Sequence, residues 1–192
     1  MTNEQSKAAK RRFNFGKFHS NYFVGSGIDI GAGPDSLGNY RHVFRGMVAV
    51  RAWDTPDGDA QYLEGVEDNT YDFAVSSHSL EHMVDVDKSL RNWIRVVKPG
   101  GYIIIAVPDE EMYERNRWPS IGNADHKWSF TVKTDSTMPK SINVLDLVKS
   151  VGDVATLEKI ELIDEFFVPG WDVDQTKTTV TECAIEIVLR KK

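Results

Sequence analysis

A carboxylate and two glycines stand close together at the end of an apolar run, and their spacing could hold a ligand. Asp29 lies next to the last apolar residue of that run, and Gly31 and Gly33 follow with one residue between them. Glycine permits positive φ and lets the backbone approach a ligand that a Cβ would block. A carboxylate at this place can accept hydrogen bonds from the amine or hydroxyl groups of a ligand. The combination is typical of the first strand and turn of a Rossmann-like fold, which binds a nucleoside-containing cofactor.

A dinucleotide fits this turn poorly. Its fingerprint needs a third glycine at position 36, where the chain has Ser36. The two glycines alone are also compatible with an ordinary tight turn. Asp29 favours the binding interpretation, because a carboxylate at the end of a buried strand is costly without a partner.

A second group of residues could move protons or bind a metal ion. His78, Glu81 and His82 follow the predicted strand Tyr71–Ser77, and they share one face if a helix begins there. Imidazole and carboxylate groups in that arrangement can bind a divalent metal. Without a metal, a histidine can act as a general base, and the candidates are His78 and His126. Glu81, His82 and Asp109 are weaker candidates for the same role.

The pattern of apolar residues indicates the elements that position these groups. Strand patterns cover residues 22–30, 47–54, 71–77 and 102–107, and a helical pattern covers 85–97. A further helix is expected near 144–151, and strand patterns at 157–167 and 178–189 flank a Gly170–Trp171 loop. Alternation of strands and helices predicts an α/β fold with a doubly wound, Rossmann-like, mostly parallel sheet and a C-terminal antiparallel β-hairpin.

Composition limits the class of protein. The 192 residues suit one domain with a single buried core. The net charge of −6 argues against general binding to nucleic acid. The longest apolar runs are too short to cross a bilayer, and no secretory signal is evident. A lone Cys183 excludes an internal disulfide and fits a reducing compartment, so we expect a cytoplasmic protein without a membrane segment.

The order of these motifs resembles the class I S-adenosylmethionine-dependent methyltransferases, and most closely the small single-domain group called methyltransferase type 11. The resemblance covers about residues 25–110. It rests on six segments: Gly27–Pro34, Asp54, Gly58–Ala60, Tyr71–Phe73, Ser76–His82 and Lys98–Tyr102. It implies a methyltransferase domain at residues 21–192. The basic and aromatic arm at 1–20 either folds over the cofactor pocket or forms a partly ordered tail.

The resemblance implies contacts to S-adenosylmethionine. Asp29 with the Gly31 and Gly33 turn would hold the aminocarboxypropyl end of the cofactor. The other implied contacts are Asp54 to the ribose, Asp59 and Ala60 to the adenine, and Ser76, Ser77 and His78 beside the reactive sulfonium.

One departure from the family pattern affects two of these contacts. Related enzymes usually place a helix and a third strand between the two acidic residues, but here only Thr55–Gly58 separate Asp54 from Asp59. Either the sheet is reduced at this point or one of the two assignments is wrong. Both aspartates are also common turn residues.

The resemblance leaves the metal and the acceptor open. Metal-dependent relatives carry Glu-x-x-Glu-His with a later histidine, so His78 replaces the first glutamate and His126 could complete a site. Metal-free relatives also carry Leu-Glu-His, and no residue is assigned as a metal ligand. Trp118, His126 and Trp128 follow a strand end and suit a small polar acceptor such as a sugar, nucleoside or metabolite. A lid packed by its own aromatic rings is the alternative.

Three functions therefore compete at the level of sequence. The leading prediction is methyl transfer from S-adenosylmethionine to oxygen or nitrogen of a small acceptor, with His78 and His126 as catalytic residues. The second is a catalytically silent cofactor-binding or assembly module. The third, a nicotinamide-dependent oxidoreductase, is disfavoured by Ser36. The oligomeric state is not predicted.

Overall fold

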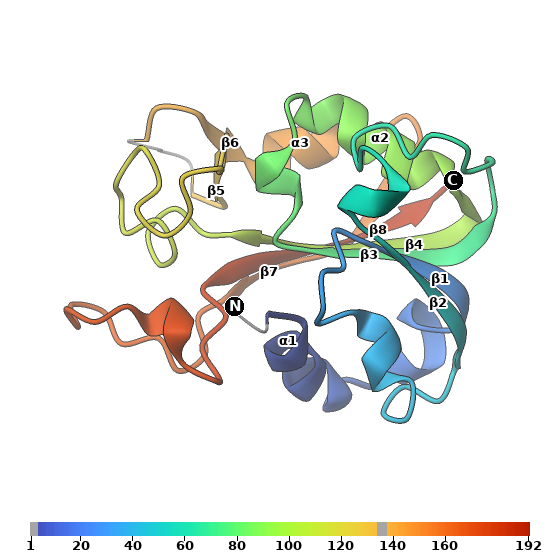
Figure 1. Cartoon of the computed structure of the whole chain (residues 1–192), viewed down its shortest axis with the longest axis horizontal. Coiled ribbons are helices and arrows are strands. Elements are labelled where there is room, and N and C mark those ends of the chain that lie inside the picture. Colours follow the sequence, from blue (N-terminus) through green and yellow to red (C-terminus); the bar gives the residue numbers. More distant parts are fainter. Residues whose placement is uncertain (1–3, 134–137) are drawn as a thin grey trace.

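A computed structural model describes residues 4–133 and 138–192, and a six-stranded sheet forms its centre. The strand order across the sheet is β2-β1-β3-β4-β8-β7 (Figure 1). In chain order, these strands are β1 (Gly25–Ile30), β2 (Met47–Trp53), β3 (Tyr71–Ser77), β4 (Val97–Pro108), β7 (Ala155–Ile163) and β8 (Ala184–Lys191).

Strands β1 to β4 are parallel to one another, whereas β8 is antiparallel to both β4 and β7. This confirms the predicted α/β fold with a mostly parallel sheet and a C-terminal antiparallel hairpin. Strand β4 shows why the centre is apolar on both faces: Ile103 and Ile105 pack into one apolar cluster, and Ile104 packs into the other. The hairpin connection spans residues 164–183, which is longer than the predicted Gly170–Trp171 loop.

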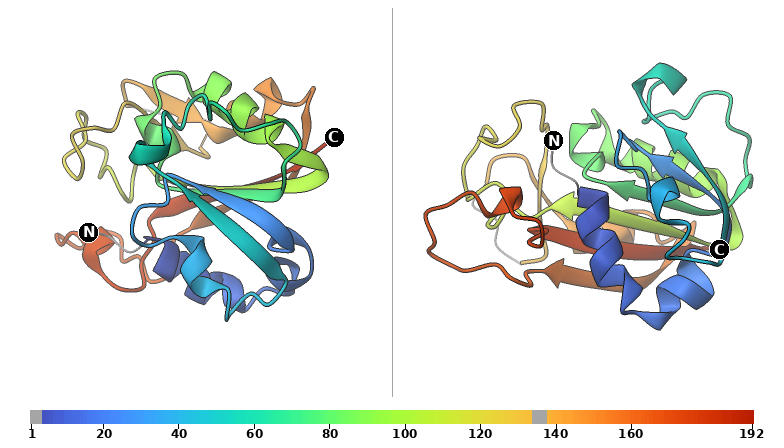
Figure 2. Two further views of the ribbon diagram at one scale, coloured as in Figure 1. Left: turned by 45° about the vertical axis from the view of Figure 1, so that its right-hand side comes forward. Right: turned by 60° about the horizontal axis from the view of Figure 1, so that its bottom comes forward.

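Helices cover both faces of the sheet (Figures 1 and 2). Helices α2 (Val86–Arg95) and α3 (Val144–Ser150) lie on one face, and α1 (Glu4–Phe13) lies on the other. The Asp85 side chain caps α2 by accepting a hydrogen bond from the backbone N–H of Lys88. Two short parallel strands, β5 (Ser129–Thr131) and β6 (Ser141–Asn143), form a separate small sheet.

The sheet is reduced between β2 and β3, which is one of the two alternatives that the sequence left open. Between β2 and β3, the described residues contain a 3₁₀ turn at Thr55–Asp57 and further turns, with no additional helix or strand. Strand β2 is consequently an edge strand of the sheet. In the part of the chain that the structure describes, no helix is long and apolar enough to cross a membrane.

The segment after β3 does not form the helix that was considered for residues 78–82. His78 has φ of +53°, a left-handed conformation that no α-helix contains. Its backbone N–H donates to the Ala106 carbonyl at 2.9 Å, so pairing with β4 continues past the end of β3. Only a 3₁₀ turn at Leu80–His82 follows. His78 is thereby separated from the turn that holds Glu81 and His82.

Helix α1 is fixed to the sheet by buried charges. The Arg12 Nε donates to Glu186 of β8 at 2.7 Å, and Arg11 NH2 donates to the same carboxylate at 2.8 Å. At the other end of the helix, Lys7 Nζ donates to the Thr176 carbonyl at 2.6 Å. These contacts bring the first turn of α1 to the carboxyl ends of the parallel strands.

Candidate active site

The glycine turn after β1 has the backbone geometry that the sequence predicted. Gly31 has φ of +75°, and a Cβ there would lie 2.2 Å from the Ser79 hydroxyl oxygen. Gly33 has φ of +51°, and a Cβ there would meet no atom within 4 Å. Gly31 is therefore needed for close packing inside the protein. Gly33 borders open space that a ligand can enter.

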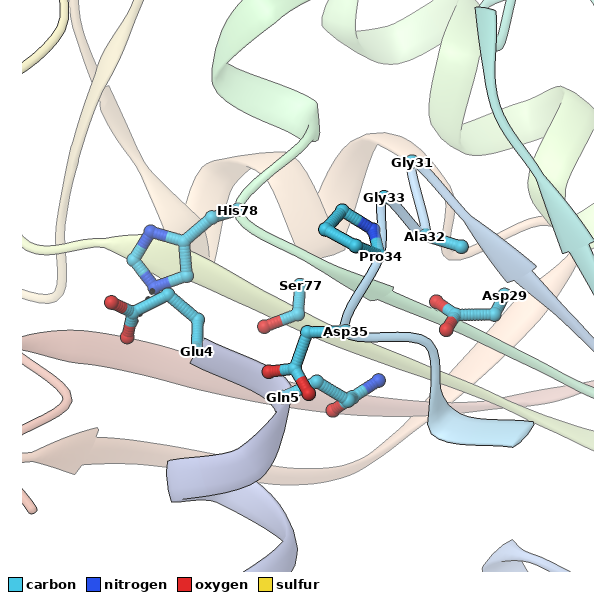
Figure 3. Close-up of a pocket in the computed structure, with 10 residues that line it drawn as sticks. All are labelled: Glu4, Gln5, Asp29, Gly31, Ala32, Gly33, Pro34, Asp35, Ser77 and His78. Carbon is cyan, nitrogen blue, oxygen red and sulfur yellow. Dashed lines mark ion pairs between the residues drawn. The ribbon is translucent and has the colours of Figure 1, made fainter. Parts of the chain in front are cut away.

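That space is a cavity of about 220 Å³ at the carboxyl ends of β1 and β3 (Figure 3). A drug-sized ligand fills roughly 300–1,000 Å³, so the cavity fits one portion of a cofactor. The residues that line it are Glu4 and Gln5 of α1, Asp29 of β1, the turn Gly31–Asp35, and Ser77 and His78 at the end of β3.

Asp29 lies at the base of the cavity and is almost completely buried. One of its carboxylate oxygens accepts a hydrogen bond from the backbone N–H of Leu37 at 2.7 Å. Burial raises the pKa of Asp29 to about 6, although the bond from Leu37 opposes this shift. The carboxylate therefore holds the turn in place and also presents a negative charge to the cavity at neutral pH.

The nucleoside contacts implied by the resemblance lie outside this cavity. Asp54 accepts from the Thr55 backbone at 2.8 Å, and Asp59 accepts from the Gln61 backbone at 2.8 Å. The Ala60 carbonyl accepts from the Trp93 indole at 2.8 Å. Ser76 is buried within the sheet and does not line the cavity. The structure thus brings Asp29, Gly31, Gly33, Ser77 and His78 together, whereas Asp54, Asp59, Ala60 and Ser76 stay predictions.

A buried cluster of imidazoles and carboxylates adjoins the cavity. Its centre is Glu81, which is fully buried, and neither of its carboxylate oxygens has a hydrogen-bond partner among the described residues. His82 Nε2 lies 3.9 Å and His126 Nε2 lies 3.8 Å from the same oxygen of Glu81. Burial raises the pKa of Glu81 to about 8. These three side chains could hold a metal ion, since one ligand atom from each lies within 4.8 Å of the others.

Two further carboxylates orient the imidazoles of this cluster. His126 Nδ1 lies 2.6 Å from Glu114, and His82 Nδ1 lies 2.9 Å from Asp125. If each Nδ1 carries the proton, both Nε2 atoms are left with a free lone pair directed toward Glu81. This is the arrangement found around metal-binding histidines, and it also suits a histidine that accepts a proton.

His78 connects the cavity with the cluster. Its ring lines the cavity, and its Nδ1 lies 3.8 Å from Glu81. The Tyr113 ring lies between His78 and His126, with centroids 5.3 Å and 5.5 Å away. Burial lowers the pKa of His78 to about 3, so its imidazole is neutral at physiological pH.

The aromatic residues that were considered for acceptor binding have other contacts. The Trp128 indole donates to the Met83 carbonyl at 2.9 Å and packs against the core, as expected for a packed lid. Trp118 is half-buried and does not line the cavity. The Asp109 carboxylate accepts two backbone hydrogen bonds, from Glu111 and Met112, both at 3.0 Å. Asp109 therefore caps a turn.

Sequence reasoning missed three residues of the site: Glu4, Gln5 and Glu114. Glu4 and Gln5 belong to a segment whose pattern allowed either a helix or a tail, so no position in it could be assigned. Glu114 lies in a segment without periodicity, and its spacing of twelve residues from His126 matches no regular element.

Comparisons with known proteins bear on the family and the fold. Residues 26–105 match a family model described as a methyltransferase domain. No curated protein sequence matches the chain.

Three solved structures illustrate the likeness in fold. An S-adenosylmethionine-dependent methyltransferase from Archaeoglobus fulgidus is 17% identical with a TM-score of 0.57, over 99% of this chain and 94% of that one. Geranyl diphosphate C-methyltransferase from Streptomyces coelicolor, solved with Mg²⁺, geranyl diphosphate and S-adenosylhomocysteine, is 11% identical with a TM-score of 0.60, over 96% and 77%. A protein assigned as a methyltransferase, in complex with the Haloferax volcanii activator Trm112, is 13% identical with a TM-score of 0.60, over 98% and 89%. At these identities the likeness establishes the fold.

Proposed function

We propose that this chain, whose residues 26–105 match a methyltransferase domain, is a class I S-adenosylmethionine-dependent methyltransferase that methylates an oxygen or nitrogen atom of a small polar acceptor. The observation that carries this proposal is the position of His78. Its ring belongs both to the wall of the cavity and to the buried cluster around Glu81. A methyl donor in the cavity would therefore face a group of side chains that can accept a proton.

We assign the methionine portion of the cofactor to the cavity. Asp29, the Gly31 and Gly33 turn and Ser77 line it. The adenosine would extend from there toward the carboxyl end of β2, where Asp54 and Asp59 lie. This arrangement follows the rule that ligands of open α/β sheets bind beyond the carboxyl ends of the strands.

His78 and His126 are the proposed catalytic residues. Methyl transfer is an in-line displacement, so the protein mainly aligns donor and acceptor and excludes water. A hydroxyl or protonated amine acceptor also has to lose a proton. His126 suits this step because Glu114 orients its ring, and His78 is a candidate because its ring borders the cavity.

Calorimetric titration with S-adenosylhomocysteine and NAD tests the cofactor assignment. We expect the wild-type protein to bind one S-adenosylhomocysteine and no NAD. Gly33→Ala should weaken binding by roughly tenfold or more, because the added methyl group enters the cavity.

Gly65→Ala is the matched control for that variant. Gly65 also has positive φ, at +77°, and open space around its Cβ position, but it lies outside the cavity. Both variants should lose about 1 kcal/mol of stability from the backbone alone. If Gly65→Ala weakened binding as much as Gly33→Ala, or if NAD bound in place of S-adenosylhomocysteine, the assignment would be wrong.

A specific observation also favours a divalent metal at the cluster. The buried Glu81 carboxylate lacks donors in the described part of the chain, while His82 and His126 direct nitrogens toward it. These residues fit a metal ion, and Glu81, His82 and His126 would hold it. Such an ion would supply a Lewis acid for an acceptor oxygen. His126 would then serve as a ligand, and His78 would be left as the candidate base.

Titration of metal-free protein with Zn²⁺ and Co²⁺ tests this metal site. One ion should bind per chain, and Glu81→Gln should weaken binding by about a hundredfold. His42→Ala, which removes an exposed imidazole, should leave the affinity unchanged. Equal binding by the wild-type and Glu81→Gln proteins would contradict a metal site, and the cluster would then act through protons alone.

The cellular compartment and the partners of the chain are further proposals. We propose a cytoplasmic enzyme, because the lone Cys183 is buried and free. The complex of a related fold with an activator protein makes a protein partner a reasonable candidate for this chain. Size-exclusion chromatography with light scattering would measure the oligomeric state.

A further inference from the structure

Glu4 lies in the first turn of α1, and it lines the cavity together with residues from the carboxyl ends of β1 and β3. The residue is 7% exposed, and its side chain points toward the His78 ring (Figure 3). Its Oε1 accepts a hydrogen bond from Lys7 Nζ at 3.0 Å. Its Oε2 has no hydrogen-bond partner among the residues that the structure describes and lies 3.9 Å from His78 Nε2. A buried oxygen without a partner is costly, so this atom is suited to a ligand.

The charges around the cavity favour a cationic ligand at this place. Glu4, Asp29 and Asp35 are among the residues that line it, whereas no described lysine or arginine does. Both oxygens of Asp35 are already used, by the Tyr40 hydroxyl and the Ser6 backbone N–H. Glu4 and Asp29 lie at opposite ends of the cavity (Figure 3). They are therefore separate negative groups for two cationic centres.

The methyl donor has two cationic centres in the relevant portion. S-adenosylmethionine carries an α-ammonium at the end of its methionine part and a sulfonium next to the ribose. The family resemblance places the residues after β3, which include His78, beside the sulfonium. Glu4 faces His78, so with the cofactor placed in this way its Oε2 would lie at the reacting end.

We propose that Glu4 contacts the sulfonium end of the cofactor and makes the site prefer the charged donor over the neutral product. This inference rests on the proposed function and adds a residue that the sequence did not identify. In the transfer, the S–CH₃ bond breaks and its electron pair stays on sulfur. The acceptor atom bonds to the methyl group and releases its proton to a base. Sulfur becomes a neutral thioether, so the attraction to Glu4 ends when the product forms.

Glu4 has to be ionised for this role. Burial raises its pKa to about 7, and Lys7 opposes that shift. Other groups that face it are His78 after β3, Glu182 next to β8 and Asp35 of the turn, and the two acidic residues add to the rise. At pH 8 the carboxylate is mostly charged. A cation beside it would lower its pKa further.

Sinefungin tests the inference without knowledge of the acceptor. In sinefungin an amine-bearing carbon replaces the methylated sulfur, so a cation stands where S-adenosylhomocysteine has a neutral sulfur. Calorimetry at pH 8 should show that the wild-type protein binds sinefungin roughly tenfold tighter than S-adenosylhomocysteine. Glu4→Gln, which has nearly the same shape, should bring that ratio close to one. Its affinity for S-adenosylhomocysteine should stay within about threefold of the wild-type value.

Glu158→Gln on the exposed side of β7 is the control, and it should keep the wild-type ratio. Circular dichroism and retained S-adenosylhomocysteine binding show that Glu4→Gln is folded. A ratio that persists in Glu4→Gln overturns the inference and leaves the proposed function intact. Equal weakening of both ligands assigns Glu4 to the α-ammonium and also overturns it. If the wild-type protein binds neither ligand, the proposed function fails together with the inference.

Discussion

At the scale of single residues, Asp29 shows how a binding group can oppose stability. Its carboxylate is buried at the end of β1, and burial raises its pKa from 3.8 to about 6. A raised pKa means that folding favours the protonated form. The associated stability is complete below pH 3.8 and is lost as the pH rises through 6. At neutral pH the apo protein therefore carries an unfavourable charge, which a cationic ligand can offset.

Asp29→Asn should therefore stabilise the apo protein and impair cofactor binding. We expect a gain on the order of 1–3 kcal/mol at pH 7.5, little change at pH 4, and a loss of S-adenosylhomocysteine affinity of roughly tenfold or more. Urea unfolding at the two pH values and calorimetry would measure these effects.

Asp72→Asn is the control, because the pKa of Asp72 is shifted in the opposite direction to that of Asp29. Burial tends to raise the pKa of Asp72, but the hydrogen bond from Lys98 at 2.7 Å outweighs it and the pKa is lowered. This variant should gain no stability. A similar gain in both variants would show that the effect has nothing to do with the charge of Asp29.

The residues of the site were predictable to different degrees. Asp29, Gly31 and Gly33 were found because strand, carboxylate and glycines are adjacent in the chain. Glu114 was not, because only the folded segment brings it to His126. His78 lines the cavity and its role there stays a prediction, but the helix considered at this place does not form, since pairing with β4 continues through its backbone.

At the scale of elements, a buried carboxylate of β8 is one of the groups that hold α1 against the sheet. Glu186 of β8 is fully buried and accepts hydrogen bonds from Arg11, Arg12 and Lys159. Burial alone would raise the pKa of Glu186, but Arg12 and Arg11 outweigh it and hold the pKa well below its usual 4.5. The resulting stability is present above pH 4.5 and is lost as the pH falls through the lowered value.

Glu186→Gln should destabilise the protein by about 3–5 kcal/mol at pH 7, because it removes the carboxylate that pairs with the buried Arg12 guanidinium, while Arg11 keeps its ion pair with Glu182. It should also weaken S-adenosylhomocysteine binding, since α1 carries Glu4 and Gln5 into the cavity. The stability difference from wild type should shrink as the pH falls below 4. Glu158→Gln on β7 makes the same chemical change at an exposed position and should cost less than about 0.5 kcal/mol. Equal stability of the two variants in urea unfolding would contradict this role of Glu186.

This ion pair also explains why the N-terminal segment could not be predicted. The partners Arg12 and Glu186 are 174 residues apart, and a basic terminal segment looks the same in sequence whether it docks or frays. The helix α2, in contrast, was predictable, because the Asp85 cap and the apolar spacing are local features. We keep the division at residue 20 as a proposal.

At the scale of the whole molecule, the sheet order follows from alternating strands and helices and from the preference for adjacent parallel neighbours. Related enzymes place a helix and a strand between the residues that correspond to Asp54 and Asp59, and the short spacing in this sequence indicated that both could be missing. Strand β2 is accordingly an edge strand. The spacing could not show whether Asp54 and Asp59 still reach a nucleoside, because both accept local backbone hydrogen bonds in this structure.

A crystal structure of the protein saturated with S-adenosylhomocysteine would show directly where the cofactor binds. We expect the methionine portion to lie between the Gly31–Gly33 turn and the Glu4–His78 pair, with the adenosine directed toward the carboxyl end of β2. An empty cavity at saturating ligand, or an adenine ring in the place assigned to the methionine portion, would contradict this placement.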